Sequence, residues 1–422
     1  MRELKDSGIE WIEEIPSEWK TSKLKFESTF KQKKYSVEYG NLNYIGLENI
    51  VAWNGRYIES DSQYDREQSL ICEKDDILFG KLRPYLAKVF ICPFKQCCSG
   101  EFCVISVHNQ NNRFVWYQLI SHGFIFMVDR STYGTKMPRA NADYIKNMQI
   151  VIPSIEEQQK IASFLDRKCS EIDAVIEKTK ATIEEYKKLK QSVITEAVTK
   201  GIRGDRPMKD SGIEWIGEIP AEWEIRKLFR AIDNIGDIDH YMPNSVATGI
   251  PYLMTGDLKE KLSDVDFGSC KMVSLDDYQT LSSKIKANKG DIIFARYATI
   301  GTVCFVDIEK EFLVSYSCLT IKPTKNLLLG RFLFYYLKSA AFFEEVNQYI
   351  NSNTQANVGL DSMTKAKVIL PKIEEQTEIA DYLDKKCAEI DTLIAKKTAL
   401  LEEMESYKKS VIYEYVTGKK EL

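Results

Sequence analysis

The chain has 422 residues, of which 44% are hydrophobic and 28% are charged. That length accommodates two to four domains, each with its own core, and the composition is that of a folded globular protein. No apolar run approaches the about 18–20 residues that a membrane span requires. The opening residues, MRELKDSGIEW, also lack the apolar stretch of a secretion signal. We therefore expect a cytoplasmic protein.

Charge is unevenly distributed along the chain. The net charge is −4, which by itself argues against a nucleic-acid partner. Residues 1–19 contain two basic and six acidic residues, whereas residues 20–150 contain 18 Lys and Arg against 13 Asp and Glu, an excess of +5. The sum over the whole chain therefore conceals a moderately basic first region.

A short segment near the N-terminus is repeated almost verbatim. KDSGIEWIEEIPSEW (5–19) and KDSGIEWIGEIPAEW (209–223) agree at 13 of 15 positions. Packing alone tolerates conservative exchanges, so this degree of copying indicates a recent duplication, a docking face that is used twice, or both. We hypothesise that Trp11 and Trp215, each with the Ile–Pro pair that follows it, anchor the segment.

Each repeat is followed by a region that differs between the two copies, at 20–152 and at 224–370. Both regions contain short apolar runs typical of strands, such as DDILFGKL in the first and GDIIFARY in the second. Helical patterns follow at 114–128 and 330–346, where the spacing of the aromatic residues favours a core role. We predict two diverged, mixed α/β domains of one α+β fold.

A second repeat predicts two long helices. Residues 153–199 and 371–417 are identical at 26 of 47 positions, at an offset of 218. Apolar residues recur every seven positions in two rows, which is the seam of a coiled coil, and about 45 residues would form a rod of about 65–70 Å. The two rods are expected to pair as an antiparallel coiled coil. The predicted seam residues are Leu165, Cys169, Ile172, Ile176, Ile183, Leu383, Cys387, Ile390, Ile394 and Leu401.

Two internal repeats at related offsets indicate a duplicated unit of three parts. The predicted boundaries are 1–19 for the first repeated segment, 20–152 for the first variable domain, 153–200 for the first spacer helix, 201–223 for a linker with the second repeated segment, 224–370 for the second variable domain and 371–422 for the second spacer helix.

Motifs for enzymatic chemistry are missing from the sequence. It contains no G-x-x-x-x-G-K-[ST] loop, no G-x-G-x-x-G turn and no Asn-Pro-Pro-aromatic tetrapeptide of amino-methyltransferases. The cysteines of CPFKQCCSGEFC (Cys92, Cys97, Cys98 and Cys103) lack the C-x2-C spacing of a zinc knuckle, which favours core packing over a metal site. We predict no catalytic residue, no metal and no cofactor in this chain.

Polar loops at matching places in the two variable domains indicate nucleic-acid binding. GKLRPYLAK and STYGTKMPRANADY gather basic and aromatic residues, and QYINSNTQANVG gathers amides. Arg and Lys bind guanine and phosphates, and Asn and Gln bind adenine, so different side chains in one frame suit two readers of different sequences. The candidates are Lys81, Arg83, Tyr85, Lys88, Tyr133, Thr135, Lys136, Arg139, Asn141, Arg296, Tyr297, Asn351, Asn353, Thr354, Gln355 and Asn357.

The layout resembles the specificity (S) subunit of type I restriction–modification systems over essentially the whole chain. The motifs that carry the resemblance are SGIEWIGEIPAEW, GDIIFARYATIG, DDILFGKLRPYLAKV and the pair IPSIEEQQKIASFLD and LPKIEEQTEIADYLD. One departure is that LRPYLAKV in the first domain corresponds to ARYATIGTV in the second, so the sequence does not fix which residues after Arg296 match the DNA-contacting candidates of the first domain.

The resemblance implies a non-catalytic DNA-recognition protein. Each variable domain would be a target recognition domain that reads half of a bipartite double-stranded DNA sequence, and the paired helices would set the gap. Two methyltransferase (M) subunits, which carry S-adenosylmethionine, would dock on the repeated frame. Restriction (R) subunits, which use ATP and Mg²⁺, would complete a DNA methylation and cleavage complex. No membrane partner is implied.

Two alternatives from other classes remain open at this point. One is an autonomous enzyme, such as a methyltransferase fused to a specificity protein, against which the missing cofactor loops count. The other is a structural coiled-coil adaptor, which explains the seam but not the repeated KDSGIEWI segment.

Overall fold

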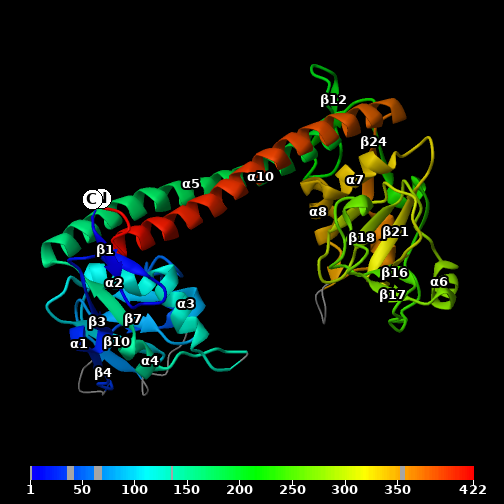
Figure 1. Ribbon diagram of the computed structural model, residues 1–422. Helices are drawn as coiled ribbons and strands as arrows, with labels where there is room; N and C mark the ends of the chain where they lie inside the picture. Colours follow the sequence, from blue (N-terminus) through cyan, green and yellow to red (C-terminus); the bar gives the residue numbers. More distant parts are fainter. Residues whose placement is uncertain (1, 36–41, 61–68, 135, 352–356) are drawn as a thin grey trace. The chain divides into compact units, whose positions relative to one another are not determined.

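The computed structural model describes residues 2–35, 42–60, 69–134, 136–351 and 357–422. The chain forms two compact units. Unit 1 comprises Met1–Lys180 and Ala399–Leu422, and unit 2 comprises Ala181–Thr398. Both units draw on the same two long helices, α5 (Ile155–Lys200) and α10 (Ile373–Val416) (Figure 1).

The remaining elements of unit 1 are short strands and helices. Its strands are β1 (Leu4–Asp6), β2 (Glu14–Pro16), β3 (Lys20–Lys23), β4 (Ser28–Lys31), β5 (Tyr44–Ile45), β6 (Leu70–Cys72), β7 (Ile77–Gly80), β8 (Val89–Ile91), β9 (Gln96–Cys98), β10 (Phe102–Val107) and β11 (Gln149–Ile152). Its shorter helices are α1 (Leu24–Glu27), α2 (Asn112–Ile120), α3 (His122–Arg130) and α4 (Ala142–Asn147), with 3-10 turns η2 (Leu47–Asn49) and η3 (Pro84–Leu86).

Unit 2 repeats this order with added elements. Its strands are β12 (Met208–Asp210), β13 (Glu218–Pro220), β14 (Glu224–Lys227), β15 (Ile232–Gly236), β16 (Ile250–Leu253), β17 (Lys271–Val273), β18 (Ile292–Ala295), β19 (Val303–Phe305), β20 (Leu313–Val314), β21 (Cys318–Pro323), β22 (Ile350–Asn351), β23 (Asn357–Val358) and β24 (Lys367–Leu370). Its helices are α6 (Leu275–Ser282), α7 (Gly330–Lys338), α8 (Ala340–Asn347) and α9 (Leu360–Lys365), with 3-10 turns η4 (Leu228–Arg230) and η5 (Leu262–Asp264).

A four-stranded antiparallel sheet is the centre of each unit, in the order β4-β10-β7-β8 in unit 1 and β15-β21-β18-β19 in unit 2. Along β7, Ile77 and Phe79 pack in one core cluster with α2 and α3, while Leu78 packs in another with the small sheet β5-β9-β6. Both faces of the sheet are therefore buried. This explains why ILF and IIF read as continuous apolar runs rather than alternating ones.

The helical pattern after each sheet is interrupted once. The predicted stretch at 114–128 forms α2 and α3, and the stretch at 330–346 forms α7 and α8. The break falls at Ser121 and Ser339, whose backbones are extended and whose hydroxyls donate to a carbonyl three residues earlier. Serine competes in this way with the helical hydrogen bonds, so a helix ends and a new one begins.

The two long helices are confirmed, and they pair antiparallel in each unit. In unit 1, Lys408 on α10 donates to Asp173 on α5 at 2.7 Å. In unit 2, Lys190 on α5 donates to Asp391 on α10 at the same distance. Each residue of one pair lies 218 positions from its counterpart in the other, so the duplicated sequence forms the same ion pair twice.

Most of the predicted seam residues are buried. The five predicted seam residues of α5 are no more than 8% exposed, and in α10 Leu383, Cys387 and Ile390 are no more than 6% exposed. Ile394 and Leu401 are half-buried. The pattern therefore identified the packed face, and burial is strong at both ends of each helix, since Val198 in α5 and Val416 in α10 are also fully buried.

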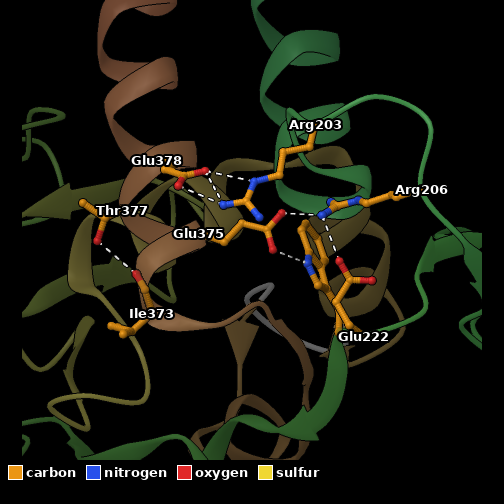
Figure 2. A network of polar contacts seen from close by, with 8 residues as sticks. Arg203, Arg206, Glu222, Ile373, Glu375, Thr377 and Glu378 are labelled. Carbon is orange, nitrogen blue, oxygen red and sulfur yellow. Dashed lines mark hydrogen bonds and ion pairs between the residues drawn. The ribbon is translucent and has the colours of Figure 1, made fainter.

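The repeated KDSGIEWI segments form matching hairpins, β1–β2 and β12–β13. Ile15 and Ile219 are fully buried, and Trp11 packs edge-on against Phe124. A second anchor of the segment was not predicted. Trp223 is also buried and donates its indole N–H to Glu375 at 2.9 Å. Arg206 pairs with the same carboxylate (Figure 2).

The same anchor occurs in unit 1. The indole N–H of Trp19 donates to Glu157 at 3.0 Å, and the guanidinium of Arg2 pairs with the other oxygen of that carboxylate. Trp19 and Trp223 are 204 positions apart, and Glu157 and Glu375 are 218 positions apart. The repeated segment is thus fixed to the first turn of the long helix that follows its own recognition domain.

We expect the seam to hold unit 2 together through buried apolar contacts. Leu383 is fully buried in its core cluster, whereas Leu393, on the same helix, is 41% exposed. Leu383→Ala should lower the free energy of unfolding by about 2–5 kcal/mol, since it leaves a cavity, and Leu393→Ala by less than about 0.5 kcal/mol. Urea unfolding followed by circular dichroism measures both, and equal effects would contradict the assignment.

Candidate nucleic-acid interface

In unit 1, the structure brings the two predicted loops into contact. The hairpin between β7 and β8 meets the loop at 131–141, where the amide of Arg83 donates to the carbonyl of Pro138 at 2.7 Å. A bridge pairs Leu82 with Arg139, and another pairs Tyr133 with Arg139. Candidates that lie about 50 residues apart in the sequence therefore form one continuous surface at the end of the central sheet.

Unit 2 repeats the arrangement with different side chains. The amide of Val358 donates to the carbonyl of Arg296 at 3.1 Å, and a bridge pairs Tyr297 with Asn357. Asn357 belongs to β23, which pairs with β22. The loop after the central strand, β7 or β18, thus meets the polar loop that follows the helix pair in both units.

Part of the predicted set has a structural partner within the protein. The ammonium of Lys88 donates to the carbonyl of Leu47 at 2.7 Å, and burial lowers its pKa. Arg139 pairs with Glu101 at 2.5 Å. The carboxamide oxygen of Asn141 accepts from the backbone amide of Asp143, in the first turn of α4. These contacts give the three side chains roles in shaping the loops.

Arg296 is held below the surface by a buried ion pair. It is 7% exposed, and its guanidinium donates to Asp237, itself 8% exposed, at 2.5 Å. His240 lies 3.1 Å from the same guanidinium nitrogen and stacks on Tyr316, with ring centroids 4.9 Å apart. The side chain of Arg296 therefore points into the domain interior, while its backbone carbonyl accepts a hydrogen bond from Val358 in β23.

Several candidates remain exposed at the tips of the loops. Tyr85 is 44% and Tyr133 64% exposed, and the side chains of Arg83 and Lys136 are also exposed. Lys81 is half-buried. Exposed cations beside exposed aromatic rings can bind phosphates and stack on or contact bases.

Some predicted residues fall outside the described part of the chain. Thr135, Asn353, Thr354 and Gln355 belong to this group, and of Asn351 only the backbone, in β22, is described.

The loop tips adopt backbone conformations that are rare for residues with a side chain. Arg83, Ala87 and Ala298 have φ angles of 51°, 47° and 55°, in the left-handed region. Such conformations cost about 1 kcal/mol or more each and persist where surrounding contacts impose them, as the bond to Pro138 does for Arg83. Both hairpins thus end in imposed, locally strained geometries at equivalent places.

Sequence reasoning missed Asp237, His240 and Tyr316. Asp237 lies 59 positions before Arg296, and nothing in the segment GDIDH distinguishes it from an ordinary loop acid. By contrast, the acids that precede the central strands were readable as turn residues. Asp76 and Asp291 each accept a backbone amide of their own turn and bind a lysine, Lys31 and Lys322 respectively.

The cysteines pack in the core. Cys92, Cys97, Cys98 and Cys103 are buried free thiols, and burial raises the pKa of Cys103 to about 11. Within the described ranges, no group of His, Cys, Asp and Glu side chains is arranged to hold a metal ion. None of the described helices is both long and apolar enough to cross a membrane.

The sequence is similar to one protein family along most of its length. The family profile for the type I restriction modification DNA specificity domain matches residues 16–185 and 222–403. The type I restriction enzyme MjaVIII specificity subunit of Methanocaldococcus jannaschii is 28% identical over 68% of this chain and 66% of the relative, slightly less than two thirds of that relative's length. The putative type I restriction enzyme MjaX specificity subunit of the same organism is 25% identical over 97% of this chain and 95% of the relative.

Solved structures share the fold. A chain from a study of complex assembly and conformational transition of the type I R-M system superposes with a TM-score of 0.75 at 17% identity, over 96% of this chain and 99% of that one. The HsdS subunit from Thermoanaerobacter tengcongensis gives a TM-score of 0.52 at 18% identity, over 96% and 98%.

We predict that Asp237→Asn destabilises unit 2 because it leaves the Arg296 guanidinium buried without its carboxylate. Removal of one partner from a buried pair costs about 3–5 kcal/mol. Asp239→Asn is the matched control, since that side chain is 71% exposed and its loss should cost less than about 0.5 kcal/mol. Thermal unfolding of both variants is the measurement, and a silent Asp237→Asn would show that Arg296 is free to leave this position.

Proposed function

Because the chain belongs to the type I restriction–modification DNA specificity family, we propose that the polar loops at the end of each central sheet read the two halves of a bipartite double-stranded DNA target. The chain is the specificity subunit, with two tandem target recognition domains. The observation that carries the loop assignment is the meeting of two polar loops at the same end of the sheet in both units, with different side chains in each.

In unit 1 we assign base and phosphate contacts to the exposed residues of the loops. Arg83 and Lys136 supply positive charge, and Tyr85 and Tyr133 supply aromatic surface. In unit 2 the corresponding candidates are Tyr297 and the amides of the segment at 351–357. We assign Lys88, Arg139, Asn141 and Arg296 to the support of these loops, because each has a partner inside its own domain.

The chain contributes recognition rather than catalysis. Its family consists of specificity subunits, so the chemistry belongs to partners: we propose two M subunits with S-adenosylmethionine and R subunits with ATP and Mg²⁺. Support for two identical M partners comes from the duplicated frame. Tyr117 donates to Asp166 on α5 at 2.8 Å, and Tyr335 donates to Asp384 on α10 at 2.7 Å, again at an offset of 218.

Substitution of the unit 1 loop should change one half-site only. In Arg83→Ala/Tyr133→Ala, we expect selectivity at one or two positions of one half to fall by about 5–150-fold, which corresponds to about 1–3 kcal/mol per base contact. The measurement is methylome sequencing of cells that express the variant with its methyltransferase partner.

Lys95→Ala is the matched control for that experiment. Lys95 follows β8, at the opposite end of the strand from the hairpin that carries Arg83, and it pairs with Glu73 at the surface. Its loss should leave both half-sites unchanged. An unchanged first half-site in the loop variant would refute the assignment of these loops, and a change in the other half-site would reverse it.

A second prediction concerns the gap between the half-sites. Insertion of four helical residues after Lys180 and four after Thr398 leaves the pairing inside each unit intact, since these positions bound the two units. Four residues add about 6 Å, which equals about two base pairs of B-DNA at 34 Å per turn. The methylated motif should keep both halves and gain about two base pairs in the gap.

The control for the gap prediction is the same insertion in α5 alone, which breaks the pairing of α5 with α10 and should reduce assembly with the methyltransferase partner. A paired insertion that leaves the gap unchanged would contradict the role of the helices as a spacer.

A further inference from the structure

Unit 2 contains a surface hollow where α5 ends. Its volume is about 620 Å³, and it is lined by the last turns of α5, the connection at 201–206, Met208 and the ring of Tyr382 on α10. Tyr382 is 36% exposed. Ala197 lies on the α5 wall.

The corresponding place in unit 1 is filled by the chain itself. The counterparts of Tyr382 and Ala197, at the offset of 218, are Phe164 and Tyr415. The rings of Phe164 and Tyr415 pack together with centroids 4.4 Å apart. Because unit 2 has alanine where unit 1 has tyrosine, one aromatic ring is missing from the wall of unit 2. Ala197 and Tyr382, between which that ring would lie, both line the hollow.

A charged contact is missing at the same place. In unit 1, Nε of Arg2 pairs with Glu421, near the C-terminus, at 3.3 Å. In unit 2 the counterpart, Arg206, lines the hollow, and its buried Nε has no hydrogen-bond partner in the described part of the chain. The other nitrogens of Arg206 bind Glu222 and Glu375 (Figure 2), and also the carbonyl of Lys200.

Unit 1 thus receives both an aromatic ring and a carboxylate from the C-terminal segment of the chain, and unit 2 receives neither. We propose that the hollow in unit 2 is a docking site for a segment of a partner protein that inserts an aromatic side chain against Tyr382 and presents a carboxylate to Arg206. The segment takes the places that Tyr415 and Glu421 occupy in unit 1.

The lining favours a peptide segment as the occupant. Glu196, Lys200, Arg203 and Asp205 are charged and exposed, so the hollow is open to solvent along one side. Arg203 is already engaged by Glu378 across its rim (Figure 2). A side chain that enters from a peptide can bury its ring while its backbone stays at the polar rim. Because unit 1 is already filled, one such partner binds per chain.

The test uses a labelled peptide with the sequence of residues 411–422, VIYEYVTGKKEL, and the full-length protein. Fluorescence anisotropy should show saturable binding at one site. Ala197→Tyr, which fills the hollow, should weaken binding by at least tenfold. Ala181→Tyr adds the same ring at an exposed position of α5 and should leave binding unchanged.

The peptide is varied in parallel. Replacement of the residue equivalent to Tyr415 by Ala should weaken binding by about tenfold, as expected for loss of a buried ring. Replacement of the residue equivalent to Tyr413 should have little effect. Replacement of the residue equivalent to Glu421 by Gln should weaken binding at low salt and less so at high salt.

Two outcomes overturn the proposal. One is the absence of saturable binding to the unaltered protein. The other is equal binding to Ala197→Tyr and to the unaltered protein, which would place the peptide elsewhere, including at unit 1 in exchange for the chain's own C-terminal segment. If Ala197→Tyr lowers the melting temperature, Tyr382→Ala replaces it, with the same expected loss. DNA half-site preference should be unchanged throughout, so this result is separable from DNA recognition.

Discussion

In each unit, a glutamate in the first turn of a long helix joins three parts of the fold. Glu375 accepts the indole N–H of Trp223, which ends the repeated segment, and pairs with Arg206, which lies in the linker just before that segment. A carboxylate with 6% exposure is costly to bury unless its oxygens are engaged, and the bonds from Trp223 and Arg206 offset that cost. The position of the glutamate at a helix N-terminus adds a favourable dipole interaction.

This constraint separates what must be copied from what can vary. The ion pairs between α5 and α10, the tyrosine–aspartate bonds and the indole–glutamate bonds all recur at fixed offsets, because each requires a defined donor and acceptor. The loops at the end of the central sheet need only a backbone route between strands. Their strained tips are held by main-chain bonds, such as that from Arg83 to Pro138, so their side chains are free to differ between the two units.

The fold was largely readable from the sequence because its signals are local and repeated. The seven-residue spacing located the buried face of α5 and α10, and the apolar runs located the central strands. The breaks at Ser121 and Ser339 were not foreseen, since an extended backbone at one serine leaves the apolar spacing on both sides almost unchanged.

The candidate interface was readable only in part, for a physical reason. A basic or amide side chain in a loop can either contact DNA or support the loop. The residue type is the same in both cases, so the sequence does not distinguish the two roles. Arg296 and Asn141 bind partners inside their own domains, whereas the side chains of Arg83 and Tyr133 are exposed. Tertiary contacts decide between these two environments. The carboxylate that holds Arg296 comes from Asp237, at the end of a different strand, so no local pattern marks it.

The duplication supplies a comparison that a single domain lacks. A residue with an identical counterpart in the other unit, such as Asp173 with Asp391, belongs to the common frame. A loop residue whose counterpart in the other unit is different is assigned to the recognition surface. Ala197 and Tyr415 also differ, as do other positions of the two long helices, but here the difference leaves a hollow in one unit where the other unit has a packed ring. A difference at such a position makes the two units of an otherwise repeated frame unequal. It leaves unit 2 alone with a site for the proposed partner segment.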